Sequence, residues 1–350
     1  MKVTLKDIAR ETGLSLSTVN HVMKGRGVFR AETKQLVLTS AQKMGYRPNV
    51  FAQGVRSGRF NSVALLLSER SDSFYLPKLL LESLHDTLAA AHMSMLVTRL
   101  PDQLLSDQGV VPRVLQQCMV DGLLIDYISS YPAVMVDLIR RYKVPVVWIN
   151  SKQKMNAVHP DDQAAGCQAA RHLLKLGHRR IAFASPASAH YSLADRRTSA
   201  AAAIRQAGGV AQLWPAPEPG AAAMYEAYAA RLRGESPPTA VIAYDLSMAT
   251  AIHAAALSQG LRMPQDLSLL TFHDVPDVSI GITTFLIPAA SMGREAVGMV
   301  LRRIADPGTD LPSAVIPFGF HAGRTCGPPP PAASAQPGPA RRRRPDRAGA

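Results

Sequence analysis

Apolar side chains recur at helical spacing along the first 45 residues, and this spacing predicts three short helices. The first two lie within residues 4–23 and are separated by a turn at Gly13; the third covers residues 31–44 and ends at Gly45. Their buried faces are expected to consist of Leu5, Ile8, Ala9, Val19, Val22, Met23, Leu36, Val37, Ser40, Ala41 and Met44. A head of about 45–48 residues lies within the size range that can fold alone.

Polar residues mark the starts of the first two helices. Thr4 with Asp7 three positions later matches a capping box, and Ser15 with Thr18 can cap the second helix. Four side chains are then left pointing outward near the start of the second helix: Leu16, Ser17, Asn20 and His21. A helix-turn-helix presents such side chains to base edges in the major groove of DNA. The head is therefore predicted to bind DNA, with an ordinary helical hairpin as the alternative.

A short helix is also predicted at residues 49–56, where Asn49 can form the N-cap and Ser57-Gly58 ends the helix. Gly54 costs such a helix about 1 kcal/mol relative to alanine. We expect it to be marginal without a partner and to link the head to the rest of the chain.

From residue 62 onward, short apolar runs alternate with helical segments. Strands are expected at 63–67, 95–98, 122–126, 145–149, 180–184, 240–243, 268–272 and 315–320, and helices at 76–91, 110–119, 132–142, 162–176, 195–207, 220–233, 246–260 and 292–304. This alternation predicts doubly wound parallel sheets, and its repetition predicts two successive α/β lobes with a cleft between them. Ligands bind outside the carboxyl ends of such strands. The loops expected there are 68–75, 126–131, 150, 185–196, 244–245 and 273–274.

Charge is distributed unevenly along the chain. Residues 1–60 hold 11 Lys and Arg against 3 Asp and Glu, whereas residues 61–326 hold 23 against 22. A basic head on a nearly neutral body suits phosphate contacts made by the head alone. Residues 327–350 are rich in Pro and Ala, hold 5 Arg against 1 Asp, and are expected to form a disordered tail.

Composition also restricts where the protein works. The three cysteines, Cys118, Cys167 and Cys326, form no CxxC pair, which indicates a reducing compartment without a disulfide frame or structural zinc. The N-terminal residues lack the apolar segment of a signal peptide. No apolar run approaches the roughly 20 residues needed to span a bilayer. We expect a cytoplasmic, nucleoid-associated protein with no membrane partner.

Several separate motifs resemble those of the LacI/GalR family of bacterial transcriptional repressors. TLKDIARETGLSLSTVNHV resembles the head signature of that family, and GYRPN at 45–49 resembles the junction before its hinge helix. The lobe signatures are matched in the expected order by HLLKLGHRRIAF (172–183), DRRTSAAAAIRQAG (195–208), MPQDLSLLTFHD (263–274) and TTFLIPAASMGREAV (283–297).

The resemblance implies a fold and a domain order. The fold is an all-α helix-turn-helix head followed by a two-lobed, periplasmic-binding-protein-like α/β domain with doubly wound parallel sheets. The expected divisions are a head at 1–48, a hinge helix and linker at 49–60, an effector-binding and dimerisation domain at 61–326, and the tail at 327–350.

The resemblance also implies a homodimer that places two heads on a pseudo-palindromic double-stranded operator. Ser17 and His21 would read base edges and Leu16 would make an apolar contact, although His21 can also be an ordinary surface histidine. Phosphate contacts are expected from Thr4, Ser15, Thr18, Thr33, Tyr46 and Asn49. In the hinge helix, Ala52 and Val55 are expected to contact the minor groove. Val55 stands where leucine is usual, and its shorter, β-branched side chain makes a smaller wedge for intercalation.

The effector site implied by the resemblance is only partly matched. Arg196 matches the effector-binding arginine of the family, and Asn150 lies where an acidic or amide ligand contact is common. Ser199, Tyr244 and His273 replace the usual Gly, Asn and Asp, so a carbohydrate or related metabolite is expected without implying an unmodified hexose. The predicted effector contacts are Phe74, Tyr75, Tyr127, Asn150, Tyr191, Arg196, Trp214, Tyr244, Asp245 and His273. Trp214 can instead cover the edge of a core.

Catalysis and metal binding are not expected. His190, Ser192 and Asp195 have the side chains of a nucleophilic triad, but residues within one loop rarely form the required hydrogen bond, and GxSxG and GxxxxGK[ST] motifs are absent. These residues are better explained as part of a pocket wall. The segment His159, Asp161 and Asp162 is better explained as an acidic helix start than as a metal site. No cofactor is expected.

Two alternative functions stay open at this point. A regulator of the same kind can respond to a protein co-regulator or to no effector. A plain solute-binding protein has the same two-lobed fold, but the basic head and the missing signal peptide disfavour it.

Overall fold

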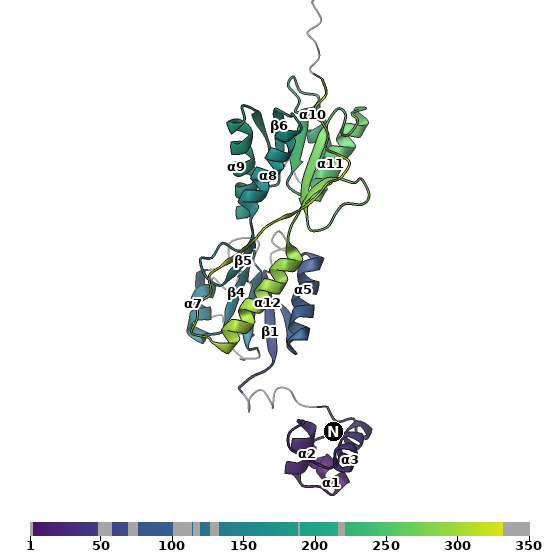
Figure 1. Cartoon of the computed structure of the whole chain (residues 1–350), viewed down its shortest axis with the longest axis vertical. Helices are drawn as coiled ribbons and strands as arrows, with labels where there is room; N and C mark the ends of the chain where they lie inside the picture. Colours follow the sequence, from purple (N-terminus) through teal and green to yellow (C-terminus); the bar gives the residue numbers. More distant parts are fainter. Residues whose placement is uncertain are drawn as a thin grey trace, which may run out of the picture. The chain divides into compact units, whose positions relative to one another are not determined.

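The computed structural model describes residues 3–47, 58–68, 76–100, 114, 120–126, 133–187, 190–215 and 221–331 (Figure 1). The chain divides into two compact units, residues 1–61 and residues 62–350. Several predicted features lie outside the described residues: Asn49, Ala52 and Val55 of the hinge helix, Phe74, Tyr75, Tyr127, most of the helix at 110–119, and the tail from residue 332.

The head consists of the three predicted helices, α1 (Leu5–Thr12), α2 (Leu16–Met23) and α3 (Ala31–Lys43). Their core is formed by Ile8, Val19, Val22, Val37 and Ala41. The helix starts are capped as predicted: the Thr4 N–H and hydroxyl donate to Asp7 Oδ2 at 3.0 and 2.7 Å, and the Thr18 N–H donates to Ser15 Oγ at 3.0 Å. Gly13 has φ +66°, which allows the tight turn between α1 and α2.

One predicted core residue of the head is exposed. Leu36 was expected on the buried face of α3, but its side chain is 47% exposed. Val37 and Ala41, one turn apart, direct that helix towards the core, and Leu36 lies about 100° away around the helix.

The second unit contains two lobes, each built on a six-stranded sheet. The first sheet has the order β11-β5-β4-β3-β1-β2 and the second has the order β12-β10-β9-β8-β6-β7. All neighbouring strands are parallel except β10 and β12, which are antiparallel. The strands are β1 (Ser62–Ser68), β2 (Ser94–Leu100), β3 (Gly122–Asp126), β4 (Val146–Ile149), β5 (Ala157–Pro160), β6 (Arg180–Ser185), β7 (Val210–Pro215), β8 (Ala240–Ala243), β9 (Ser268–His273), β10 (Thr283–Leu286), β11 (Ala314–Ile316) and β12 (Gly319–His321).

Helices cover both faces of each sheet, as the predicted doubly wound fold requires (Figure 1). The helices are α5 (Lys78–Ala90), α7 (Ala133–Tyr142), α8 (Asp162–Lys175), α9 (Tyr191–Gln206), α10 (Ala221–Leu232), α11 (Leu246–Ser258) and α12 (Ala289–Ala305). Along β1, Val63 and Leu65 pack into the core with α5 and α12, whereas Ala64 and Leu66 pack into the core with α7. In the second lobe, α8 and α9 cover one face and α10 and α11 the other.

The two lobes are interleaved in sequence rather than successive, which corrects the prediction. Helix α12 follows β10 of the second lobe but packs against α5 in the core of the first. The single strand expected at 315–320 is two strands, β11 in the first sheet and β12 in the second. The chain therefore passes between the lobes three times, after β5, after β10 and after β11.

The end of the described chain is part of the second lobe. The tail was expected to begin at residue 327, but the Gly327 N–H donates to Ser268 Oγ at 3.1 Å, and the Gly327 carbonyl accepts a hydrogen bond from His178 Nε2 at 2.9 Å. These bonds explain why Gly327 is buried rather than disordered. Within the described part of the chain, no helix is both long and apolar enough to cross a membrane.

Candidate functional site

The outer face of α2 carries the predicted base readers. Ser17 and His21 are exposed and lie one turn apart. His21 Nδ1 lies 2.8 Å from the Ser17 carbonyl oxygen, so the ring is held against the helix and its Nε2 edge faces outward. Leu16 is 43% exposed beside them. A groove between α1 and α2 is lined by Thr4, Leu5, Lys6, Leu16, Ser17 and Asn20.

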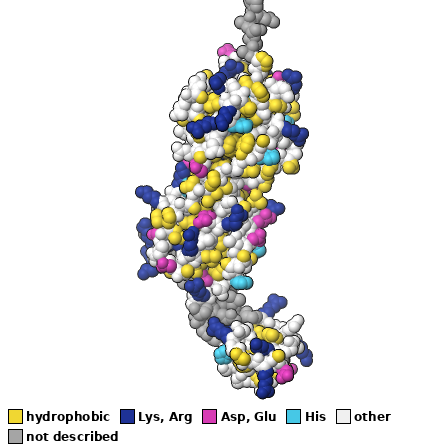
Figure 2. Space-filling view, viewed as in Figure 1, with side chains coloured by type: hydrophobic (Ala, Val, Ile, Leu, Met, Phe, Trp, Pro, Cys, Tyr) yellow, Lys and Arg dark blue, Asp and Glu magenta, His cyan; other side chains and the backbone are white. Residues whose placement is uncertain are grey.

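The other described residues predicted to contact DNA are accessible on the head. Thr4 and Ser15 are exposed, and Thr18, Thr33 and Tyr46 are half-buried. Lys6 also lines the groove between α1 and α2 but was not predicted as a DNA contact. It could have been found from the sequence, because it is a basic residue next to a core position of α1. Figure 2 shows Lys and Arg side chains spread over the visible face of the head.

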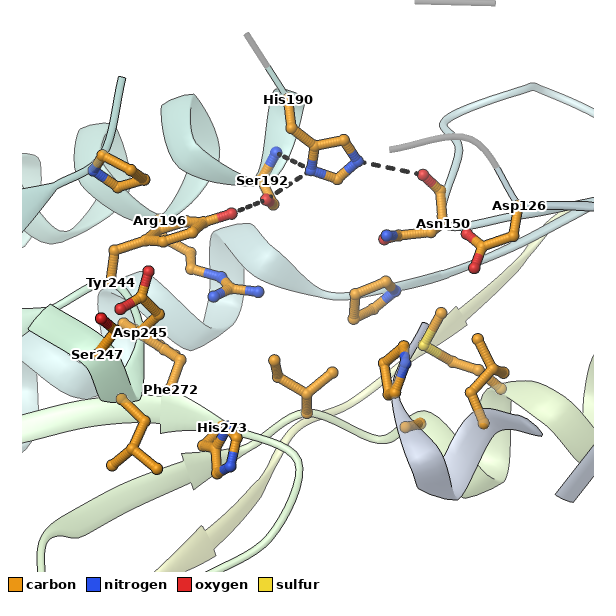
Figure 3. Close-up of a pocket in the computed structure, with 18 residues that line it drawn as sticks. Asp126, Asn150, His190, Ser192, Arg196, Tyr244, Asp245, Ser247, Phe272 and His273 are labelled. Carbon is orange, nitrogen blue, oxygen red and sulfur yellow. Dashed lines mark hydrogen bonds between the residues drawn. The ribbon is translucent and has the colours of Figure 1, made fainter. Parts of the chain in front are cut away.

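A second candidate site is a cavity of about 510 Å³ between the two lobes (Figure 3). Residues at the carboxyl ends of strands from both sheets line it, as predicted for an open α/β fold. Its described lining consists of Pro77, Leu80, Asp126, Asn150, Pro160, Pro186, His190, Ser192, Arg196, Tyr244, Asp245, Leu246, Ser247, Phe272, His273, Ile287, Ala289 and Met292. The volume is that of a small-molecule site.

Arg196 of α9 is fixed in the cavity wall and is only 4% exposed. Its Nε donates to Asp162 Oδ1 at 2.6 Å, and its guanidinium lies 4.9 Å from the ring centroid of Tyr244 and 4.7 Å from that of Phe272. Burial raises the pKa of Asp162, and the charge of Arg196 opposes that rise. One edge of the predicted effector-binding arginine is therefore already engaged by a carboxylate of the protein.

A glycine on α8 allows this arrangement. A Cβ atom at Gly166 would lie 2.3 Å from the Arg196 carbonyl oxygen and 2.7 Å from Arg196 Cα. The absence of a side chain at Gly166 thus lets α8, which begins at Asp162, approach the segment of α9 that carries Arg196.

A chain of hydrogen bonds runs across one side of the cavity (Figure 3). The Tyr244 hydroxyl lies 2.6 Å from Ser192 Oγ, which lies 2.7 Å from His190 Nδ1, and His190 Nε2 lies 3.3 Å from the Asn150 carbonyl oxygen. Burial lowers the pKa of His190 to about 4, so its ring is neutral at pH 7. The Asn150 carbonyl oxygen can only accept, so the single ring proton is on Nε2 and Nδ1 is an acceptor. Ser192 therefore donates to Nδ1, and Tyr244 donates to the Ser192 hydroxyl oxygen. This chain links the second lobe to the loop after β4 of the first.

The hydrogen bond between Ser192 and His190 was not expected for residues so close in sequence. A triad further needs a carboxylate that orients the histidine. His190 Nε2 instead meets a backbone carbonyl, and Asp195 pairs with Lys152. With the pKa of His190 lowered to about 4, the ring is also a weak base. The group therefore has the properties of a structural hydrogen-bond chain.

Asp126 lines the cavity and was not among the residues predicted from the sequence. It ends β3, is 4% exposed, and its Oδ1 has no hydrogen-bond partner among the described residues. Burial raises its pKa to about 7. The available signal was an acidic residue directly after the buried run GLLI.

The structure brings together five of the predicted effector contacts: Asn150, Arg196, Tyr244, Asp245 and His273 all line the cavity. Tyr191 lies behind this wall, where its hydroxyl donates to Asn150 Oδ1 at 3.3 Å. Asp245 also caps α11 by accepting from the Met248 N–H at 2.8 Å. Within the described chain, no group of three or more His, Cys, Asp or Glu side chains could hold a metal ion.

Trp214 is not part of the cavity lining. Its side chain is 6% exposed and stacks on Tyr228, with 6.1 Å between ring centroids, in the core that α10 and α11 form with the sheet. The alternative that Trp214 covers a core edge is therefore the one that the structure supports, and Trp214 is too deeply packed to stack on a ligand.

Comparisons with known proteins agree with both parts of this architecture. Residues 4–49 match the model of the bacterial regulatory proteins of the lacI family, and residues 170–326 match a periplasmic binding protein-like domain. The transcriptional regulator DegA of Bacillus subtilis is 28% identical over 84% of this chain and 89% of its own length. The transcriptional repressor PurR of Klebsiella pneumoniae is 27% identical over 87% of this chain and 91% of its own.

Solved structures share the fold. A Lac repressor dimer bound to operator and the anti-inducer ONPF aligns with a TM-score of 0.79 at 19% identity, covering 93% of this chain and 100% of that one. The regulator CelR in complex with cellobiose aligns with a TM-score of 0.63 at 21% identity, over 93% of this chain and 100% of that one. A helix-turn-helix head joined to a two-lobed domain with an interlobe cavity defines a class of DNA-binding transcriptional regulators. This chain belongs to the LacI family of those regulators.

Proposed function

We propose that the protein is a homodimeric repressor of the bacterial cytoplasm whose affinity for a pseudo-palindromic operator depends on a small molecule in the interlobe cavity. The observation that carries this proposal is a cavity of about 510 Å³ at the carboxyl ends of both sheets, in a chain that also has a helix-turn-helix head. A carbohydrate or related metabolite is the expected class of effector.

In this proposal the head recognises DNA through α2. Ser17 and His21 contact base edges, and Leu16 makes an apolar contact. Hydroxyl and amide groups at Thr4, Ser15, Thr18, Thr33, Tyr46 and Asn49 contact phosphates and set the position of the head. Ala52 and Val55 of the hinge helix contact the minor groove.

The cavity supplies the control. Asn150 and His190, which lie in different lobes, are joined by a 3.3 Å hydrogen bond beside the cavity. A ligand that contacts both lobes favours one arrangement of them over another, and this preference is transmitted through the hinge to the two heads. Ligand contacts are proposed for Phe74, Tyr75, Tyr127, Asn150, Arg196, Tyr244, Asp245 and His273, and Tyr191 is proposed to hold Asn150 in place from behind the wall.

Operator binding tests the proposal. A binding site is first selected from random double-stranded DNA, and affinity is then measured by fluorescence anisotropy at several salt concentrations. We expect a palindromic site and a steep loss of affinity with salt, because counterions are released from contacted phosphates. The double variant S17A/H21A should lose preference for the selected site but keep non-specific binding. Absent binding, or binding insensitive to salt, by the folded protein contradicts the proposal.

A further inference from the structure

Among the described lining residues, the positive charge of the cavity is balanced within the protein. Arg196 is paired with Asp162 at 2.6 Å, and both side chains are almost fully buried. His273 Nδ1 lies 3.3 Å from Asp274 Oδ1, which can balance any charge on that ring. Burial lowers the pKa of His190 to about 4, so this ring contributes no positive charge at pH 7.

Of the two carboxylates that line the cavity, only one is engaged in the described structure. Asp245 accepts a hydrogen bond from the start of α11. Asp126 is 4% exposed, and its Oδ1 has no hydrogen-bond partner among the described residues. Figure 3 shows its carboxylate and the Arg196 guanidinium on opposite sides of the cavity. A buried carboxylate without a donor is costly, so a donor supplied by a ligand is strongly favoured.

The other described side chains of the first lobe that line the cavity offer Asp126 few hydrogen-bond donors. The first-lobe side chains that share the lining are largely apolar: Pro77, Leu80, Pro160, Ala289 and Met292. Apolar walls with a few polar groups are typical of sites for organic molecules, in which the polar groups fix orientation.

We propose that the effector is a small organic amine whose ammonium group pairs with Asp126 and whose body lies against the apolar wall, and that the cavity rejects carboxylates and phosphates. The inference rests on the proposed function, because it names the class of effector. An anion gains little from Arg196, whose charge Asp162 already balances, and it is repelled by Asp126.

Matched probes test this inference on the full-length protein. Each set shares one body and differs in its polar group: tryptamine, tryptophol and indole-3-acetate form one set, and the 2-aminoethyl, 2-hydroxyethyl and carboxymethyl β-glucosides form another. Thermal shift assays at pH 8 with millimolar probe should show stabilisation by the amine of at least one set and by neither acid. The Asp126→Asn variant should bind that amine about 30-fold more weakly or worse, since buried charge pairs contribute 2 kcal/mol or more.

The control variant is Asp137→Asn, which removes a carboxylate from the exposed side of α7 and should leave amine binding unchanged. The inference is overturned if an acid is the strongest stabiliser in either set, if no amine stabilises the protein, or if amine binding survives Asp126→Asn. Operator binding is measured on the same preparations. Intact operator binding without an amine response refutes the effector class while leaving the proposed DNA-binding function in place.

Discussion

Burial acts in the same way on two titratable side chains of the cavity, Asp126 and His190: it favours their uncharged forms. Asp126 and His190 lie in different lobes, and burial raises the pKa of the first to about 7 and lowers that of the second to about 4. Arg196 is buried as well, and its Nε atom lies 2.6 Å from Asp162 Oδ1. These three environments depend on contacts between residues far apart in sequence. The sequence therefore indicated Arg196 and His190 as pocket residues, but it indicated neither Asp126 nor the charges of the three side chains.

Replacing Asp126 by Asn should raise the free energy of unfolding at pH 8. In the unfolded chain this carboxyl loses its proton near pH 4, whereas the folded protein keeps the proton until the pH approaches 7. The wild-type protein is therefore destabilised as the pH rises from about 4 to about 7, and the cost stays constant above that range. The gain from Asn is at most about 4 kcal/mol at pH 8 and disappears near pH 4.

Urea denaturation of the wild-type protein and the variant at pH 5 and pH 8 measures this difference. A variant that is no more stable than the wild-type protein at pH 8 would show that the Asp126 carboxylate has a partner in the folded state.

At the scale of elements, strands with unbroken apolar runs were predictable, whereas β5, β7 and β10 were missed. Strands β5 and β10 lie inside their sheets, but each has only four residues, and His159, Thr283 and Thr284 interrupt the apolar pattern. The strands β3 and β8 have the predicted bounds, because every residue in them is buried. Strand β7 was missed since it lies at the edge of its sheet, where Val210 and Leu213 are exposed. The lobe to which α12 belongs was also unpredictable, because its apolar face would suit either lobe and its partner α5 lies about 200 residues earlier.

Gly166→Ala should destabilise the second lobe by about 1–3 kcal/mol and displace Arg196. The new Cβ would lie 2.3 Å from the Arg196 carbonyl oxygen, and since these are backbone atoms, α8 and α9 must separate to relieve the contact. Gly298→Ala on α12 is the matched control. Nothing lies within 4 Å of its Cβ position, so alanine should stabilise that helix by up to about 1 kcal/mol.

Chemical denaturation of both variants, with wild-type protein alongside, measures the two effects. If Gly166→Ala is as stable as Gly298→Ala, then α8 and α9 do not approach as closely as this geometry requires.

At the scale of the whole molecule, the cavity and the DNA-binding helices belong to different units of the chain, the first within residues 62–350 and the second within residues 1–61. The uneven charge of the sequence follows the same division. The sequence predicted that the DNA-binding helices and the cavity lie in different units, because each unit has its own motifs. It did not predict the three passages between the lobes, which depend on pairing of strands distant in sequence.

The buried ion pair between Arg196 and Asp162 offers a test of whether the second unit can be altered without loss of operator binding by the head. Removing Arg196 alone leaves Asp162 buried without its partner, with an expected cost of about 3–5 kcal/mol, whereas the double variant D162N/R196M removes both charges and should recover most of that loss. Because the head is unchanged, the double variant should bind the selected operator within about twofold of wild-type affinity, a difference of about 0.4 kcal/mol. Its operator affinity should still respond to the amine that stabilises the wild-type protein, because Asp126, the proposed partner of the ammonium group, is unchanged. Anisotropy titrations with and without that amine measure both properties, and loss of operator binding together with the ligand response would make the pair a structural requirement of the whole protein.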